Sequence, residues 1–96
     1  MKWSKNHVSD IQIAYIGGGS KLWAWKLMAD LALEPALSGT IRLYDIDTDA
    51  AEKNALVGNQ LKDRADAPGK WNYTVAYNLK DALTGVDFVI ISILPG

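Results

Sequence analysis

The chain has 96 residues, of which 49% are hydrophobic and 22% are charged, and its formal net charge is −1. This composition is that of a folded globular domain, and the balanced charge excludes electrostatic attraction to nucleic acid or to an anionic membrane. The chain has no cysteine, which excludes disulfides, thiolate metal sites and cysteine nucleophiles within it. No apolar run approaches the ~20 residues of a membrane span, and we expect a cytoplasmic protein.

Strands and helices are predicted to alternate along the chain. Residues 11–16 are short, rich in β-branched side chains and followed by three glycines, so they predict a buried strand. Apolar residues from Ala24 to Leu31 recur at helical spacing, and Pro35 ends the helix that they indicate. The predicted elements in chain order are a tail at 1–10, a strand at 11–16, a helix at 21–33, a turn at 38–39, a strand at 41–46, a helix at 50–62, a strand at 71–77, a short helix at 79–83 and a strand at 86–93.

This alternation predicts an α/β domain over residues 11–96, with a Rossmann-type, mainly parallel sheet and right-handed crossovers. Both long helices of such a unit pack on one face of the sheet, which leaves only the short helix for the other face. We therefore expect a three-layer fold truncated to a β-α-β-α-β-β core, with one face incompletely covered. The bare apolar face and the free edge of the last strand predict self-association into a homo-oligomer.

A glycine-rich turn joins the first predicted strand to the first helix. At such a turn the pyrophosphate of a dinucleotide meets backbone N–H groups and the positive end of the helix dipole. Gly17 would permit the tight turn, and Gly19 would let the backbone approach the phosphates without a Cβ in the way. Leu22 replaces the third glycine of the G-x-G-x-x-G pattern, which predicts a wider spacing of helix and strand. The cofactor-binding residues predicted here are Gly17, Gly18, Gly19, Ser20, Lys21 and Leu22.

Asp45 stands at the end of the second predicted strand, somewhat further from Gly19 than the usual ~20 residues. A carboxylate there accepts hydrogen bonds from both adenosine ribose hydroxyls and repels a 2′-phosphate, so NAD is favoured over NADP. Asp47 competes for this role but is expected to cap the second helix, and capping is also the alternative for Asp45. Ile46 is predicted to contact the cofactor beside Asp45.

The exit of the last predicted strand is the third candidate element. In doubly wound sheets the ligand crosses the carboxyl ends of the strands at the switch point, here between the first and fourth strands. The backbone there is expected to pass near the adenosine ribose or the pyrophosphate, and the alternative is a plain transition from strand to loop. The residues concerned are Ser92, Ile93, Leu94 and Pro95.

Three blocks in this order resemble glycoside hydrolase family 4: residues 13–20 (IAYIGGGS), 43–47 (LYDID) and 87–96 (DFVIISILPG). The resemblance runs from about residue 11 to residue 96, and its nearest branch is the α-galacturonidase and α-glucosidase-like one. The Leu-Pro-Gly ending differs from the Arg-Val-Gly ending of many phospho-glycosidases, which argues against a 6-phosphorylated sugar. The chain thus resembles only the N-terminal segment of such an enzyme.

The resemblance implies an NAD- and divalent-metal-dependent glycosidase that acts on a glycoside such as an α-galacturonide or α-glucoside. It further implies oxidation of the sugar 3-hydroxyl by NAD, elimination of the glycosidic bond, addition of water and return of the hydride, with a metal, often manganese, polarising the sugar oxygens. The family's Cys and His metal ligands and its tyrosine base lie beyond position 96, so no catalytic or metal-binding residue is assigned here. We expect these 96 residues alone to hydrolyse no glycoside.

Other functions share parts of this pattern. A lactate or malate dehydrogenase-like oxidoreductase has the same fold and loop, and a methyltransferase has a similar loop and strand-end acid. A non-catalytic nucleotide-binding module, or a glycine turn without any ligand, also remains open. Outside the loop, Trp23 and Trp25 are expected to pack, the tyrosines to lie in the core or on the sheet, and Asn54 and Asn59 to face solvent or a neighbouring domain.

Overall fold

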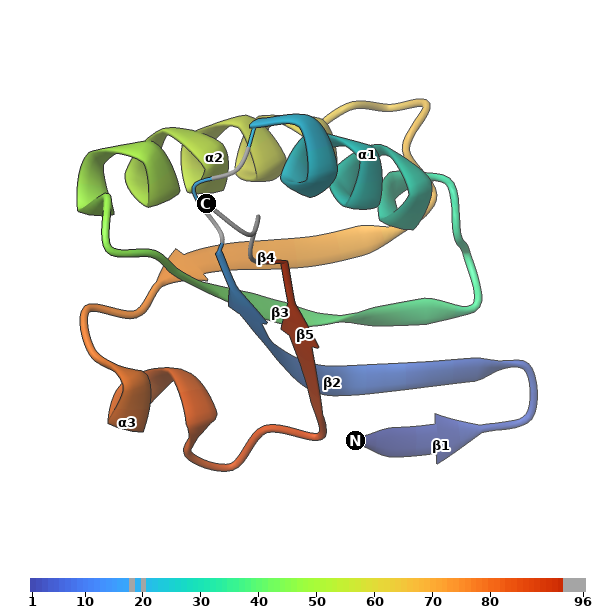
Figure 1. The fold of residues 1–96 in the computed structure, drawn as a ribbon. Helices are drawn as coiled ribbons and strands as arrows, with labels where there is room; N and C mark the ends of the chain where they lie inside the picture. Colours follow the sequence, from blue (N-terminus) through green and yellow to red (C-terminus); the bar gives the residue numbers. More distant parts are fainter. Residues whose placement is uncertain (18, 20, 93–96) are drawn as a thin grey trace.

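The computed structural model describes residues 1–17, 19 and 21–92, arranged in three layers (Figure 1). The sheet lies in the middle, with α1 (Lys21–Ala32) and α2 (Thr48–Lys62) on one face and α3 (Leu79–Leu83) on the other. The strands are β1 (Lys2–Ser4), β2 (His7–Ile16), β3 (Leu37–Tyr44), β4 (Lys70–Val75) and β5 (Phe88–Ile91). The predicted α/β class, with both long helices on one face of a Rossmann-type sheet, is confirmed.

The pairing of the strands places β2 at the centre of the sheet. β3 pairs in parallel with one edge of β2, and β4 pairs in parallel with β3. On the other edge, β5 runs parallel to the second half of β2, with Ile13 opposite Phe88 and Ile16 opposite Ile91. The first and last of the parallel strands are therefore neighbours, and their carboxyl ends meet where a doubly wound sheet has its switch point.

The first ten residues form a hairpin where a tail was predicted. β1 pairs antiparallel with the start of β2, with Trp3 opposite Val8, so β2 begins at His7 instead of residue 11. Apolar patterning missed this part of β2 because residues 7–10 are polar apart from Val8, and none of them is fully buried. A register shift between Val8 and Ile11, with Asp10 at a φ of 55°, separates the hairpin from the parallel part of the strand.

β3 begins at Leu37, four residues earlier than predicted, and the expected turn at Ser38 and Gly39 does not form. Gly39 lies opposite Ile11 in the parallel ladder, and a Cβ on Gly39 would stand 2.0 Å from the Ile11 carbonyl oxygen. Close approach of two strand backbones, and not a turn, explains this glycine. The strands also end earlier than predicted, at Tyr44, Val75 and Ile91.

The main core lies between the sheet and the two long helices, and a smaller alanine-rich cluster lies between the sheet and α3. The entries of α2 and α3 are capped as predicted: the Asp47 side chain accepts a hydrogen bond from the Ala50 N–H, and the Asn78 side chain accepts one from the Asp81 N–H. The largest fully buried side chains are Trp71, Met28, Ile41 and Leu43. Within the described part of the chain, no helix has both the length and the apolar character that crossing a membrane requires.

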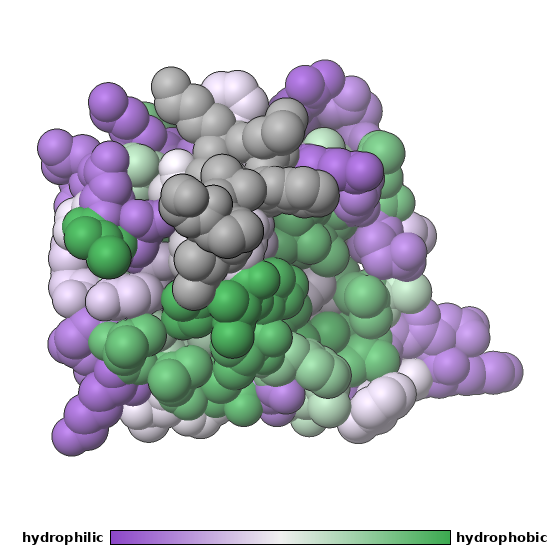
Figure 2. Space-filling model, viewed as in Figure 1, coloured by the Kyte–Doolittle hydropathy of each residue, from purple (hydrophilic) through white to green (hydrophobic). Residues whose placement is uncertain are grey.

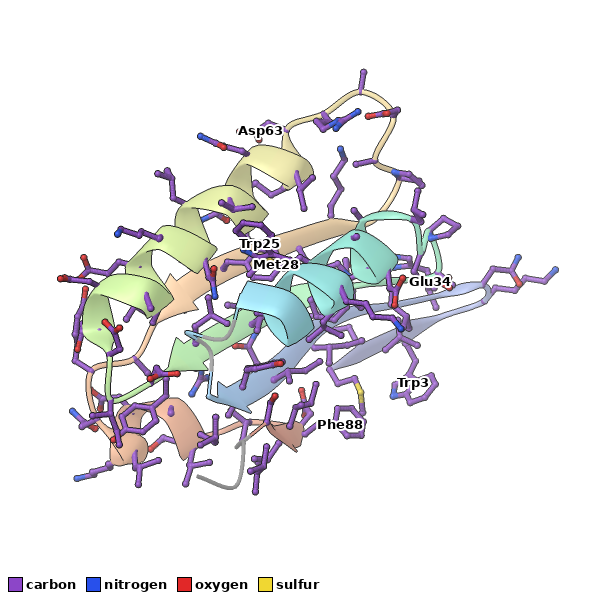
Figure 3. The ribbon with its side chains drawn as sticks, turned by 45° about the horizontal axis from the view of Figure 1, so that its top comes forward. Trp3, Trp25, Met28, Glu34, Asp63 and Phe88 are labelled. Atoms are coloured by element: carbon purple, nitrogen blue, oxygen red, sulfur yellow. The ribbon has the colours of Figure 1, made fainter. Side chains whose placement is uncertain are left out.

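Two asparagines of α2 do not face solvent as predicted. Asn54 is 2% exposed and accepts a hydrogen bond of 2.9 Å from the Trp25 indole N–H, which lies on the side of α1 that faces α2 (Figure 3). The Asn59 amide both donates to and accepts from the backbone of Tyr73 in β4. Polar groups close to a core need such partners, and helical spacing alone does not reveal them.

Candidate functional site

The candidate residues that the structure describes gather at one end of the sheet. Gly17, Asp45 and Ser92 each directly follow a parallel strand, namely β2, β3 and β5. The carboxyl ends of these strands form a common edge, and the backbone of α1 begins beside it at Lys21. Among the predicted site residues, those that lie outside the described residues are Gly18, Ser20, Ile93, Leu94 and Pro95, together with the side chains of Lys21 and Leu22.

Gly17 is the point where β2, β3 and β5 are joined. Its N–H donates to the Tyr44 carbonyl oxygen at 2.8 Å, and one residue earlier the Ile16 carbonyl oxygen accepts from the Ser92 N–H at 2.8 Å. Gly17 has a φ of 95°, and a Cβ there would stand 2.1 Å from the Ser92 carbonyl oxygen. The positive φ is the conformation for which the tight turn was expected to need glycine, and the closeness of Ser92 adds a second reason for glycine.

Asp45 is hydrogen-bonded to the glycine turn. Its Oδ2 accepts from the Gly19 N–H at 2.9 Å, and its Oδ1 accepts from the Asp47 N–H at 2.9 Å. A Cβ on Gly19 would stand 2.8 Å from Asp45 Oδ2 and 2.9 Å from the Ala50 Cβ. Gly19 is therefore in contact with the carboxylate and with the first turn of α2, a contact that the sequence did not indicate.

Asp45 does not cap α2, because that role belongs to Asp47. The alternative of capping is thus set aside for Asp45. A carboxylate has about four acceptor positions, so two backbone N–H donors leave acceptor capacity on both oxygens for further hydroxyl donors. Ile46, the next residue, is 95% exposed, and a large apolar side chain so fully in solvent is available to a flat apolar ligand.

Ala50 is the site residue that the sequence analysis missed. Its methyl group faces Gly19 at the entry of α2, and its N–H donates to Asp47 Oδ1 at 3.1 Å. The pair Ala50 and Ala51 at the start of a helix was a usable signal, since small side chains there permit a close approach of another backbone.

Two tyrosines stand at this end of the sheet: Tyr44, half-buried, ends β3 and packs against the alanine-rich cluster beside α3, and Tyr77 comes shortly after β4. Tyr15 and Tyr73 are buried in the main core, and burial raises the pKa of Tyr73 well above its ordinary value. Tyr77 follows β4 and does not lie within it as predicted; its hydroxyl donates to Glu52. His7 lies at the opposite end of β2. In the described ranges, no group of three or more His, Cys, Asp or Glu residues is placed to hold a metal ion.

Known proteins match this chain along nearly all of its length. The family 4 glycosyl hydrolase profile matches residues 12–96. The chain is 58% identical to an alpha-galacturonidase of Lachnoclostridium phytofermentans over 96 residues, which are 100% of this chain and 21% of that protein. It is 50% identical to an alpha-galacturonidase of Bacillus subtilis over 93 residues, 94% of this chain and 20% of the relative. The chain thus spans about a fifth of the length of these relatives.

Solved structures share the fold described above. The crystal structure of Bacillus subtilis lplD, described as a glucosidase, superposes with a TM-score of 0.81 at 48% identity, over 93% of this chain and 19% of that one. A 6-phospho-beta glucosidase of Thermotoga maritima, solved with manganese, NAD+ and glucose-6-phosphate, has a TM-score of 0.64 at 24% identity, over 90% of this chain and 20% of that one. Given the profile match over nearly the whole sequence and the two alpha-galacturonidase relatives, this chain belongs to the family 4 glycosyl hydrolases.

Proposed function

We propose that the chain is the NAD-binding N-terminal segment of a glycosidase that acts on an α-galacturonide. The family membership supports a glycosidase, and the relatives at 50% identity or more that bear the name alpha-galacturonidase support the sugar. An α-glucoside is the second candidate substrate, because a structure at 48% identity is described as a glucosidase. A divalent metal, manganese by preference, belongs to the same proposal for the whole enzyme, as does a cytoplasmic location.

The residues at the carboxyl end of the sheet fit a dinucleotide. NAD, when bound, supplies reversible hydride exchange with the sugar carbon that bears a hydroxyl group. Asp45 would hold the adenosine ribose by its remaining acceptor positions, and its negative charge would oppose a 2′-phosphate. Ile46 would cover the adenine, since its side chain is 95% exposed beside that carboxylate. The start of α1 would face the pyrophosphate, because the N–H groups of Gly17 and Gly19 already donate to Tyr44 and Asp45.

One observation carries this proposal: Asp45 lies beside the glycine turn, 2.9 Å from the Gly19 nitrogen, while Asp47 caps the helix. Calorimetric titration of NAD into the 96-residue chain tests it, with S-adenosylmethionine as the competing ligand class. Replacement of Asp45 by Ala is expected to weaken NAD binding by about 1–3 kcal/mol through loss of charged hydrogen bonds. Asp49→Ala removes the same charge from the exposed first turn of α2 and is the matched control.

Equal affinities of the Asp45→Ala and Asp49→Ala chains for NAD would contradict the ribose role. Tight binding of S-adenosylmethionine and none of NAD would replace the proposal by a methyltransferase-like one. We also propose that the 96 residues alone turn over no nitrophenyl galacturonide with NAD and manganese, because the sequence has no cysteine and its one histidine lies at the far end of β2. Turnover above the blank would refute this part.

A further inference from the structure

Gly19 is enclosed by protein atoms of its own chain. The position that a Cβ would occupy lies within 2.9 Å of both carboxylate atoms Cγ and Oδ2 of Asp45 and of the Ala50 Cβ. A Cβ at Gly19 would be closer to these atoms than van der Waals packing allows, and all of the atoms belong to the chain itself. The absence of a side chain at Gly19 is therefore already required by packing against Asp45 and α2, whatever a phosphate group also requires.

A continuous chain of hydrogen bonds runs from Gly19 to the first turn of α2. The Gly19 N–H donates to Asp45 Oδ2, the Asp47 N–H donates to Asp45 Oδ1, and the Ala50 N–H donates to Asp47 Oδ1. The two oxygens of Asp45 thus hold two backbone segments that are 26 and 2 residues away in sequence. Bonds from backbone N–H groups to a carboxylate are among the stronger hydrogen bonds in proteins.

We propose that Asp45 is a positioning residue that holds the Gly19 backbone against the start of α2 before any nucleotide binds. Ordering a loop costs free energy on binding, and a loop that is already ordered avoids most of that cost. The Asp45 carboxylate would then serve a cofactor twice, by holding Gly19 in place and by accepting from the ribose. Only the second of these contributions rests on the proposed NAD function.

Amide hydrogen exchange of the nucleotide-free chain tests the positioning role. In the wild type the Gly19 and Asp47 amides are expected to exchange at least about tenfold more slowly than in Asp45→Ala, as the strength of charged hydrogen bonds implies. Asp45→Asn keeps the shape but has one acceptor oxygen, so protection should fall at one of the two amides. Asp49→Ala should protect both as the wild type does, and the Ile41 and Leu43 amides of β3 monitor global folding.

Gly19→Ala separates this role from a phosphate role without any ligand. Its new methyl group must displace the Asp45 carboxylate, so the Asp47 amide, which is remote from any phosphate, should lose its protection as well. If the Asp47 amide keeps its protection in Gly19→Ala, or if Gly19 exchanges equally fast in the wild type and in Asp45→Ala, the inference is overturned. If both protections behave as expected but NAD does not bind, the positioning role stands and the proposed function fails.

Discussion

Two glycines of the chain share a positive φ but differ in their surroundings. Gly17, at 95°, lies against the Ser92 backbone, whereas Gly85, at 70°, has no atom within 4 Å of its Cβ position. The left-handed conformation alone costs an L-residue about 1–2 kcal/mol. The difference between the two positions therefore isolates the cost of crowding at the junction of β2, β3 and β5.

We predict that Gly85→Ala lowers the free energy of unfolding by about 1 kcal/mol. Gly17→Ala should lower it by about 3 kcal/mol or more, because the clash is with backbone and no side-chain rotation relieves it. Urea denaturation of both variants measures the difference. Equal losses would mean that β5 moves away from Gly17 at no cost, which would contradict the close join of the three strands.

Tyr77 and Glu52 provide a prediction on pH. The Tyr77 hydroxyl donates to Glu52 Oε1 at 2.9 Å, and this hydrogen bond, with smaller effects of desolvation and of the carboxylate charge, raises the pKa of Tyr77. A raised pKa in the folded state means that the contact contributes fully below about pH 10 and that its contribution is lost as the pH rises through the folded pKa.

Ultraviolet titration of tyrosinate measures this pKa, and the component that disappears in Tyr77→Phe belongs to Tyr77. Glu52→Ala is expected to lower the Tyr77 pKa toward its ordinary value, because the acceptor and its charge are both removed. Asp49→Ala, which deletes a carboxylate from the first turn of the same helix, should leave the titration unchanged. A Tyr77 component that does not move in Glu52→Ala would show that the hydrogen bond is absent in solution.

At the scale of elements, α3 depends on one side chain of the sheet. Arg42 of β3 donates hydrogen bonds to the carbonyl oxygens of Asp81 and Thr84 at the end of α3, and a longer one of 3.3 Å to Gln12 Oε1. The apolar contact of this helix is small, since its one buried residue is Ala82. Arg42 is therefore expected to hold α3 to the sheet.

We predict that Arg42→Ala lowers the free energy of unfolding by about 1.5–3 kcal/mol, the range for hydrogen bonds to a charged group. Arg64→Ala is the matched control: Arg64 pairs with Asp66 on an exposed surface, and such pairs contribute little to stability because solvent screens them. Urea denaturation compares the two, and hydrogen exchange of the Ala82 amide reports α3 itself. If Ala82 remains as protected in Arg42→Ala as in Arg64→Ala, packing of Ala82 and not Arg42 holds the helix.

The elements also show which features a single sequence discloses. The two long helices and the parallel strands were predictable because their apolar periodicity is strong, and the chemically distinct caps Asp47 and Asn78 marked the starts of α2 and α3. The β1 hairpin was not, because its pairing with residues 7–9 depends on backbone hydrogen bonds that no side-chain pattern records. Gly39 was wrongly assigned to a turn for the same reason. A glycine in a turn and a glycine that lies close to the backbone of a neighbouring strand look identical in sequence.

In the candidate site, too, some features were predictable from the sequence and others were not. The places of Gly17 and Asp45 directly after β2 and β3 were predictable because apolar strand patterns end at these residues, whereas their role toward a dinucleotide is a proposal. The bond from Gly19 to Asp45 was not predictable, because it depends on the exact spacing of β2, β3 and α2 in space. Ala50 was missed because a small residue near a helix entry has many explanations, and only the contact with Gly19 selects one.

At the scale of the whole molecule, β5 exposes several large apolar side chains to solvent. Phe88, Val89 and Ile91 are 53%, 47% and 67% exposed, and Figure 2 shows apolar residues gathered on the face where β5 lies in Figure 1. Phe88 and Trp3 both point away from the body of the protein (Figure 3). A groove of about 310 Å³ between α1 and β5, lined in part by Leu27, Ile90 and Ile91, continues this surface.

The two outer strands of the parallel sheet differ in their protection. At β4 the outward N–H and carbonyl groups of Tyr73 are bonded to the Asn59 amide. At β5 pairing with β2 uses one edge, and no described residue pairs with the other edge of the strand. An apolar strand with a free edge and no charged residue from Phe88 to Ile91 is a template for pairing with another chain. We therefore expect the 96-residue chain to self-associate through β5.

Light scattering across a range of concentrations, together with binding of a hydrophobic dye, measures this association. Val89→Lys places a charge on the exposed side of the edge strand, and such charges are a common means by which proteins block edge pairing, so this variant should be largely monomeric and bind less dye. Leu56→Lys places the same charge at a 62% exposed apolar residue of α2, and this variant should associate as the wild type does.

A monodisperse wild-type monomer that binds no dye would refute the expected self-association. Equal dissociation by both lysines would mean that net charge, and not the β5 edge, governs association, because the two variants change the charge equally and differ only in where they place it.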